Sequence, residues 1–261
     1  MIVPLVIASL AIGITLVYAS YRDVQERRVP HRTWRPALVV AVPMAVWAYW
    51  MIALSGWRFA AGLIVLALVF CGIFYAFQAF NLFGGADAYA LIIITACVPA
   101  FPAEPLLGYP PLPFFPFTVL TNAVILNIAA PVGIFLHNLL QGNRAPFPYL
   151  FLGFPVEGKA IQNSFGFVME DISEEDGHLV RKFVGFRESL KRMVQGKNRI
   201  YTKDLRNYPE QYRNELALYR KAGRVWLSYG IPFIIPITAG FISALLVGDI
   251  LYLIMKTLAG V

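Results

Sequence analysis

The sequence is poor in charged residues. Only 14% of its 261 residues are Asp, Glu, Lys or Arg, whereas 58% are hydrophobic and the mean hydropathy is +0.62. A soluble domain of this size usually carries about 25% charged residues and about 45–50% apolar ones. The composition therefore excludes an ordinary soluble domain and favours a membrane protein.

Cysteine and histidine are also scarce. The two cysteines, Cys71 and Cys97, both lie in apolar runs and form no CxxC pair, which excludes a zinc knuckle and a thioredoxin-like redox site. Buried free thiols are favoured over a disulfide. The histidines lack the spacing of metal ligands, and we predict no metal site and no cofactor; they are His31, His137 and His178.

Long apolar runs are what the sequence has in abundance. A helix needs about 20 apolar residues to cross the hydrocarbon of a bilayer. Six segments meet or approach this length: 1–21, 36–54, 59–80, 87–101, 115–140 and 229–255. The first has no basic residues before it, so we interpret it as a retained helix and not as a signal peptide. The sequence predicts an all-α polytopic membrane protein with six transmembrane helices.

Most of the charge lies in one block between the fifth and sixth segments. Fifteen of the 22 Lys and Arg residues fall between Arg144 and Arg224. The positive-inside rule then places this block in the cytoplasm and the N-terminus outside. No aromatic-plus-basic module accompanies the charge, so it indicates membrane lipid as a partner and no nucleic acid. We expect a membrane domain over 1–140, a cytoplasmic α+β domain over 141–227 and the sixth transmembrane helix over 228–261.

The charged block shows the pattern of a small folded insertion. SFGFVM and HLVRKFV are predicted as short strands around the turn SEEDG. FRESLKRMV and PEQYRNELALYRKAG are predicted as helices, the second ending at Gly223. The acidic residues near the turn could attract a basic peptide, although a solvated turn is the default interpretation. They are Glu170, Asp171, Glu174, Glu175 and Asp176.

Two carboxylates are predicted at the same membrane depth. Asp23 follows the first apolar segment and Asp87 begins the fourth, so both lie on the cytoplasmic side. Ionisable groups at membrane depth are costly and indicate function. Two neighbouring carboxylates can share a proton, one acting as base on water and the other as acid toward a carbonyl oxygen. Gly84, Gly85 and Ala86 provide room for a substrate backbone.

Each carboxylate also has a structural interpretation. Asp23 can pair with Arg27 one helical turn later, and Asp87 suits the N-terminus of a helix. The pair can equally form the proton or cation site of a small membrane transporter. A protease that cuts within the bilayer is a third reading, but it calls for deeper aspartates than one followed closely by Arg27 and Arg28.

Three separated motifs resemble one family. RDVQERRVPHR, which contains Asp23, looks like the first signature of type IV prepilin peptidases, and FGGAD resembles their second, GxGD-type motif. VWLSYGIPFIIPITAG resembles the archaeal branch, the preflagellin and archaeal prepilin peptidases. The resemblance covers most of the chain. It implies that Asp23 and Asp87 are the catalytic pair of an aspartic endopeptidase. It also implies protein precursors as substrates, whose short basic leader is removed at the cytoplasmic face just before a hydrophobic helix.

The chain departs from the family pattern at two positions. Ala86 replaces the second glycine of a strict GxGD motif, which is sterically mild, and Tyr89 stands where many relatives carry Lys. The bacterial branch that also methylates its product has a cysteine-rich zinc insert. This chain has no such insert, so the resemblance implies a peptidase without methyltransferase activity.

Four further residues have predicted roles. Gln78 and Asn81 flank the glycine turn and can hydrogen-bond Asp87 or the substrate backbone. Glu26 is expected to pair with Arg22 or neighbouring basic groups at the surface. Asp249, in the last apolar segment, is expected to make a polar contact between helices.

Overall fold

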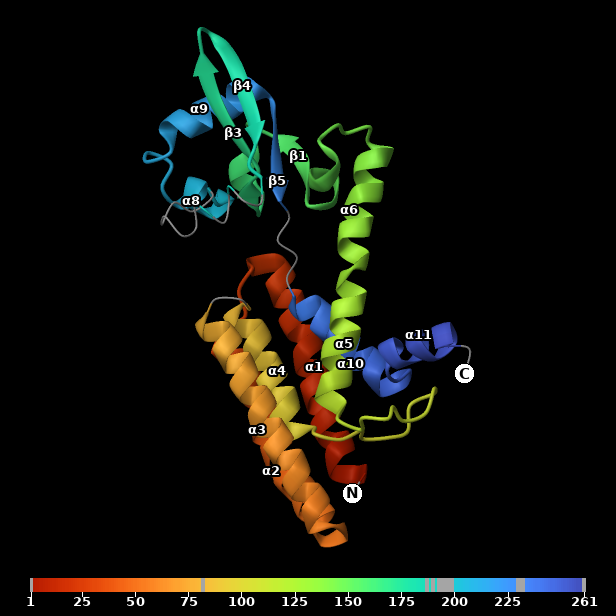
Figure 1. Ribbon diagram of the computed structural model, residues 1–261. Coiled ribbons are helices and arrows are strands. Elements are labelled where there is room, and N and C mark those ends of the chain that lie inside the picture. The colour runs from red at the N-terminus through yellow and green to blue at the C-terminus, as the bar shows by residue number, and fades with distance from the viewer. Residues whose placement is uncertain are drawn as a thin grey trace. The chain divides into compact units, whose positions relative to one another are not determined.

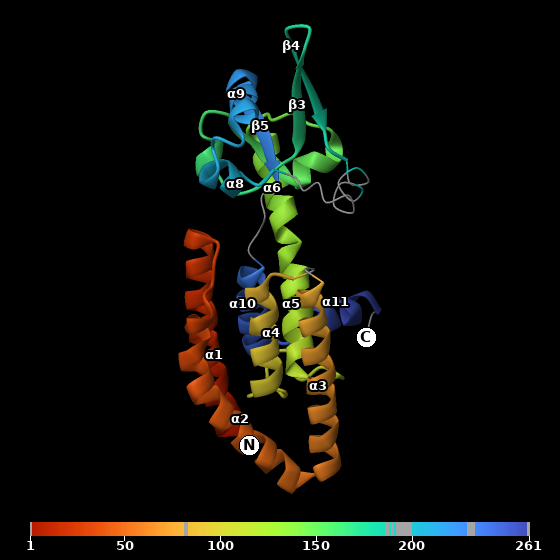
Figure 2. The same cartoon turned by 90° about the vertical axis from the view of Figure 1, so that its left-hand side faces the viewer.

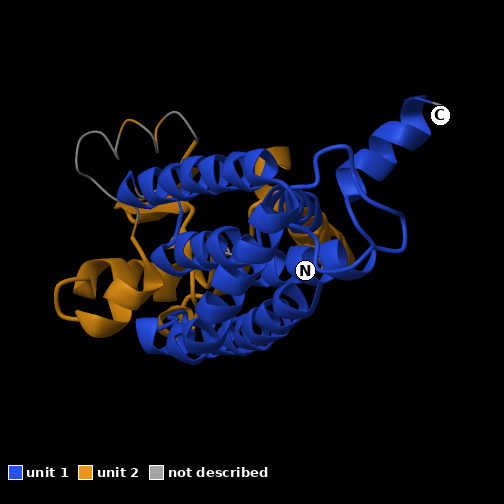
Figure 3. Ribbon diagram, turned by 90° about the horizontal axis from the view of Figure 1, so that it is seen from below, with its two compact units in different colours: residues 1–128, 232–261 blue, residues 129–231 orange. Residues whose placement is uncertain are grey.

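The computed structural model describes residues 2–80, 83–185, 188, 191, 200–228 and 233–259. The chain forms two compact units, the first of residues 1–128 and 232–261 and the second of residues 129–231 (Figure 3). Each unit is described by itself below.

The first unit is helical. Its elements are α1 (Ile2–Glu26), the 3-10 helix η1 (His31–Trp34), α2 (Arg35–Ser55), α3 (Trp57–Ala79), α4 (Gly85–Cys97), α5 (Phe115–Asn127), α10 (Ile234–Leu246) and α11 (Ile250–Ala259). Helix α1 packs against α2 and α10, α3 against α4, and α5 against α10 (Figures 1 and 2). Helix α10 therefore lies between elements that come more than a hundred residues earlier in the chain.

Small residues allow the helices of this unit to approach closely. Ala41, Ala45 and Ala48 recur along one buried face of α2 and join a core that includes Leu5 and Ile12 of α1. Large apolar side chains point outward instead, as membrane-spanning helices require. The alternation of small buried and large exposed residues agrees with a bundle surrounded by lipid.

The described helices confirm several membrane spans but not six. Four stretches are long and apolar enough to cross a membrane: Ile2–Glu26, His31–Ser55, Trp57–Ala79 and Phe115–Leu140. The pair α10 and α11 gives a fifth if it is counted as one span, and α4 is a shorter apolar helix. The fourth predicted segment is thus shorter than expected, because its helix ends at Cys97.

The last predicted transmembrane segment is not one continuous helix, and that prediction is wrong. Helices α10 and α11 meet at an angle of 64°. Gly248 adopts a φ of 110°, which a side chain would disfavour. The side chain of Asn122 donates to the Gly248 carbonyl over 2.8 Å and accepts the Ile250 N–H over 2.9 Å. A buried amide on α5 therefore stabilises the break, and hydropathy alone gives no sign of it.

Asp249 makes the polar contact between helices that the sequence predicts. It is 8% exposed, and its Oδ1 accepts the backbone N–H of Tyr252 over 2.9 Å, which caps α11. The hydroxyl of Thr118 on α5 donates to Oδ2 over 3.2 Å. The residue lies at the break before α11 and not inside a helix, as the predicted segment implied.

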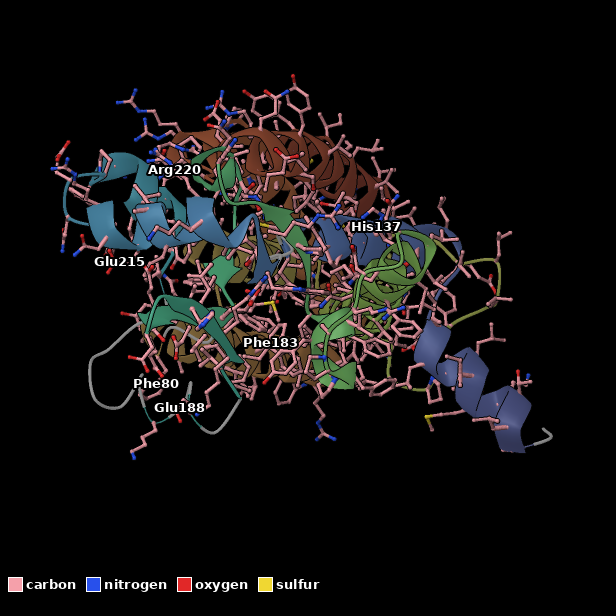
Figure 4. The ribbon with its side chains drawn as sticks, turned by 90° about the horizontal axis from the view of Figure 1, so that it is seen from above. Phe80, His137, Phe183, Glu188, Glu215 and Arg220 are labelled. Atoms are coloured by element: carbon pink, nitrogen blue, oxygen red, sulfur yellow. The ribbon has the colours of Figure 1, made fainter. Side chains whose placement is uncertain are left out.

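The second unit is α+β. Strands β1 (Gly153–Glu157), β5 (Arg224–Ser228) and β2 (Phe167–Val168) form an antiparallel sheet in the order β1-β5-β2, and β3 (Glu170–Glu175) pairs with β4 (His178–Phe183). Helices α6 (Ala129–Leu140), α8 (Thr202–Asn207) and α9 (Arg213–Ala222) and the 3-10 helices η2 (Phe147–Phe151) and η3 (Ile161–Asn163) complete it. On α9, Leu216 and Tyr219 are buried, whereas Arg220 is exposed (Figure 4).

Two strand predictions in this unit need correction. Only Phe167 and Val168 of SFGFVM are a strand, and they pair with β5 and not with HLVRKFV. The partner of HLVRKFV is β3, so most of SEEDG is strand and the turn is confined to Asp176 and Gly177. Strand β3 was not predicted because its sequence is polar, and an exposed hairpin lacks the apolar alternation that indicates a strand.

The acidic residues near the turn do not share one environment. Glu170 is buried, forms two hydrogen bonds with Arg181 at 2.8 and 2.9 Å, and accepts the Trp226 N–H. It is therefore a structural anchor between β3 and β5 and not part of a solvated turn. Glu174 pairs with Lys221 on α9 at the surface.

Only one of the two helices predicted in this unit lies within the described residues. Helix α9 ends before Gly223, as predicted, but begins at Arg213, four residues after the predicted start. The segment FRESLKRMV lies almost entirely outside the described residues.

Both cysteines are free thiols, as expected, with Cys97 buried and Cys71 partly buried.

Candidate active site

Asp23 lies in the last turn of α1 and is partly buried. The helix ends at Glu26, and the next residue, Arg27, has a left-handed φ of 52° and donates its N–H to the Asp23 carbonyl over 2.9 Å. This conformation is uncommon for a residue with a side chain. It places the Arg27 charge within electrostatic range of the Asp23 carboxylate, and the two attract. The pairing that the sequence predicts for Asp23 therefore exists as a Coulombic interaction.

Asp87 is the third residue of α4, and its carboxylate turns back over the start of its own helix. It interacts with the backbone N–H of Gly84, the residue that precedes the helix. An acid at this position commonly satisfies a free N–H of the first turn. A Cβ on Gly84 would lie only 2.7 Å from Oδ2 of Asp87. Gly84 therefore leaves the space that the carboxylate occupies.

A second helix also reaches Asp87. The backbone N–H of Ile234, the first residue of α10, interacts with the same carboxylate. The first N–H groups of a helix have no partner within the helix and carry partial positive charge. Close by, the ring of Phe83 before α4 packs against that of Phe233 before α10, with centroids 5.6 Å apart. The starts of α4 and α10 are thus joined at Asp87.

The structure places the two predicted carboxylates within electrostatic range of each other. The charge of Asp23 acts on Asp87 although 64 positions separate them in the sequence. Helix α1 contacts both α4 and α10, so three elements converge here. Two interacting carboxylates on partly buried positions can take up different protonation states, which is what acid and base roles need.

A hydroxyl pair holds α1 against α10 one turn from these groups. The Oγ of Ser20 lies 2.8 Å from Oγ1 of Thr238, and Thr238 also donates to the Ile234 carbonyl over 2.8 Å. Ser20 is three residues before Asp23, and Thr238 is four residues after Ile234. Sequence analysis missed this pair. Its only signal was a serine near Asp23 and a threonine in an apolar helix, and many helices contain those.

The predicted substrate-binding residues surround the glycine turn where they are described. Gly84 and Gly85 are exposed and Ala86 is partly buried. The Gln78 amide nitrogen would be 3.7 Å from a Cβ on Gly85, so its side chain reaches the turn from α3. Asn81 lies outside the described residues.

Glu26 and Tyr89 both turn toward neighbours other than the carboxylate pair. Glu26 accepts a hydrogen bond from Arg22 over 2.7 Å, as the sequence predicts. The ring of Tyr89 packs edge-on against His31 and Trp34, with centroids 5.4 and 6.0 Å away. Tyr89 therefore ties α4 to the segment that follows Asp23.

Comparisons with known proteins identify the family. Residues 10–137 match the model of the type IV leader peptidase family, and residues 145–250 match the archaeal peptidase A24 C-terminus, type II. Together the two matches take in both motifs and the charged block.

Three relatives agree over almost their whole length. A preflagellin peptidase of Methanococcus maripaludis is 26% identical over 241 residues, which covers 90% of this chain and 92% of the relative. Those of Methanocaldococcus jannaschii and Methanococcus voltae are 23% and 25% identical, covering 91% and 92% of this chain and 92% and 94% of the relatives. This multi-pass membrane protein therefore belongs to the type IV leader peptidase family, with the archaeal peptidase A24 C-terminus in its second half.

Proposed function

We propose that the protein is a membrane aspartic endopeptidase that removes the short basic leader of preflagellin- or prepilin-like precursors. The observation that carries the proposal is the convergence of Asp23 and Asp87 at the start of α10. Family membership and the names of the relatives agree with it.

In this proposal water is the nucleophile. One carboxylate removes a proton from the water while the other donates a proton to the oxygen of the scissile carbonyl. The N–H groups of Gly84 and Ile234 hold Asp87 at the junction of two helices, so its orientation does not depend on the substrate. Neither a covalent enzyme intermediate nor a cofactor is part of the reaction, and we expect no methyltransferase activity.

The orientation in the membrane belongs to the same proposal. The distribution of Lys and Arg places the N-terminus outside and the catalytic carboxylates in the cytoplasm, together with residues 141–227. A precursor would then present its basic leader to the cytoplasmic face while its hydrophobic segment stays among lipids. The exposed glycine turn of Gly84 and Gly85 gives an extended backbone access to Asp87.

The proposal is tested by cleavage in vesicles. The full-length protein is reconstituted and incubated with a preflagellin precursor and with a prepilin precursor, and the new N-terminus is mapped by mass spectrometry. We expect one cut between the basic leader and the hydrophobic segment. A precursor with its leader lysines and arginines changed to glutamine is the matched control, and it should be cut more slowly.

Two results would count against the proposal. One is a folded wild-type protein that cuts neither precursor. The other is a cut that persists in both Asp23→Asn and Asp87→Asn. Proton or cation flux through the vesicles that requires the two aspartates would instead favour the transporter.

A further inference from the structure

A pocket lies on the face of α1 that turns away from α10. Its volume is about 400 Å³, and it lies between the second half of α1 and the segment that leads into α2. Its polar lining comes from Thr15, Tyr18 and Arg22 on α1 and from Arg32 and Thr33 on η1. Ile14 and Pro36 provide apolar wall. The pocket thus combines two guanidinium groups and three hydroxyls with an apolar surface.

The two arginines carry positive charge that the neighbouring side chains do not fully neutralise. Arg22 donates through Nη2 to Glu26, while its Nε is enclosed and has no acceptor among the described residues. Arg32 is exposed, and no hydrogen bond or ion pair joins its side chain to another side chain or carbonyl in the described part of the protein. Glu26 is the one acid in contact with either arginine among the described residues. An enclosed donor without an acceptor is unfavourable, and an anion beside the two guanidinium groups would be stabilised by their charge.

The position of the pocket indicates which anion it takes. Helix α1 is long and apolar enough to span a membrane, and Arg22 lies near the end of it, two turns beyond Ile14. A phosphate at the membrane surface would be level with Arg22 and Arg32, and hydrocarbon would be level with Ile14. Guanidinium groups bind phosphate oxygens through charge-assisted, often paired hydrogen bonds.

We propose that this pocket binds the headgroup phosphate of an anionic phospholipid, with the upper part of an acyl chain against Ile14 and Pro36. The site is separate from the carboxylate pair. Arg22 and Asp23 are consecutive residues and point about 100° apart around α1. A bound lipid would fasten the end of α1 to the segment before α2 without entering the proposed catalytic site. This inference does not depend on the proposed peptidase activity.

The test measures lipid retention by the full-length protein. The detergent-purified, delipidated protein is mixed with equal amounts of phosphatidylglycerol and phosphatidylcholine, and bound lipid is counted by native mass spectrometry. We expect the wild type to retain phosphatidylglycerol preferentially. Arg32→Gln should lower that retention about tenfold, since losing a charge-assisted bond of about 1.4 kcal/mol has this effect.

Arg28→Gln is the matched control, because Arg28 is an exposed arginine of the same segment that does not line the pocket. It should change retention by less than about twofold, since a charge outside the pocket makes no hydrogen bond to the phosphate and acts only through screened attraction. Arg22→Gln should resemble Arg32→Gln. If it does not fold by circular dichroism, the comparison of Arg32→Gln with Arg28→Gln decides alone.

Three outcomes would overturn the proposal. The first is equal retention of the two lipids by the wild type. The second is an equal loss in Arg32→Gln and Arg28→Gln, which would mean general surface charge. The third is full displacement of the lipid by inorganic phosphate at millimolar concentration, which would assign a small-anion site without an acyl-chain contact.

Discussion

Helix α10 has a carboxylate at each of its ends, and the two have opposite surroundings. Beyond its C-terminal end, Asp249 is buried, accepts the Tyr252 N–H and the Thr118 hydroxyl, and caps α11. At its N-terminal end, Asp87 is partly buried, interacts with two backbone N–H groups and lies within electrostatic range of Asp23. Both residues occupy the start of a helix, the position that aspartate commonly takes.

The difference agrees with a structural role for Asp249 and with the catalytic role that we propose for Asp87. Asp249 has a side-chain donor for one oxygen and a backbone donor for the other, so its carboxylate is hydrogen-bonded within the fold. Among the described residues, Asp87 has the backbone donors of Gly84 and Ile234 and lies in electrostatic range of a like charge, which costs free energy. A helix-capping position by itself therefore does not reveal the role of an aspartate. The charges and donors around it do.

The largest difference in cleavage rate is expected when an Asp→Asn substitution is made at either end of α10. Asp87→Asn and Asp23→Asn should each lower cleavage of a preflagellin-type precursor by about 10³-fold or more, because each removes a proton donor or acceptor. Asp249→Asn should keep cleavage within about threefold, since asparagine caps helices as well as aspartate does. Initial rates in vesicles measure this. Equal losses at Asp87 and Asp249 would erase the distinction.

The second prediction concerns the scaffold that both ends share. A Cβ on Gly240 of α10 would lie 2.6 Å from backbone atoms of Val119 and Ala123, whereas one on Gly72 of α3 would meet nothing within 4 Å. Gly240→Val should therefore destabilise the protein by about 1–3 kcal/mol through overpacking. Gly72→Val carries the same change in helix propensity and should be nearly neutral. Thermal unfolding in detergent compares them, and similar melting temperatures would contradict the close α5–α10 contact.

The third prediction concerns Gly84 and the space that it leaves for the Asp87 carboxylate. Gly84→Ala should lower cleavage about tenfold, or about 1.4 kcal/mol in the barrier, because its Cβ would push Oδ2 of Asp87 aside. Gly85→Ala should stay within about twofold, since its Cβ would meet only the Gln78 amide at 3.7 Å. If the order of the two effects is reversed, the glycines serve substrate access and not the placement of Asp87.

The fourth prediction removes the cap at the other end. Asp249→Ala should lower the free energy of unfolding by about 1 kcal/mol, the usual cost of losing an N-cap. Cleavage by the folded fraction should be unchanged. Denaturant titration and rates at saturating substrate separate the two quantities, and Asp249→Asn is the control that keeps the cap. A fall in rate without a fall in stability would assign Asp249 a role beyond structure.

The smallest effect is expected at Glu26, the acid nearest to Asp23 in the sequence. It pairs with Arg22 at a site where both side chains are partly exposed, and such pairs are worth about 0.2–1 kcal/mol. Glu26→Gln should change the cleavage rate by less than about tenfold. A loss as deep as that of Asp23→Asn would mean that Glu26, and not Asp23, is the acid of α1 that acts with Asp87.

Local patterns in the sequence were sufficient for much of this description. Hydropathy located the apolar helices because the cost of burying polar groups in lipid applies residue by residue. The end of α9 at Gly223 and the pair of Glu26 with Arg22 followed from spacing within one helix. Asp23 and Asp87 became candidates because a carboxylate beside an apolar run is rare and costly, and the family resemblance, not the local pattern, implied that they act as a pair.

The tertiary structure alone decided which groups surround those carboxylates. The Ile234 N–H reaches Asp87 only because α10 packs against α1, α4 and α5, and the break at Gly248 depends on an amide of α5. Glu170 changed from a supposed turn residue to a buried anchor for the same reason. These partners lie from 11 to 147 positions apart, and a sequence pattern with the period of one helix or strand cannot encode them. Their contacts arise when distant elements pack and unpaired donors must find acceptors.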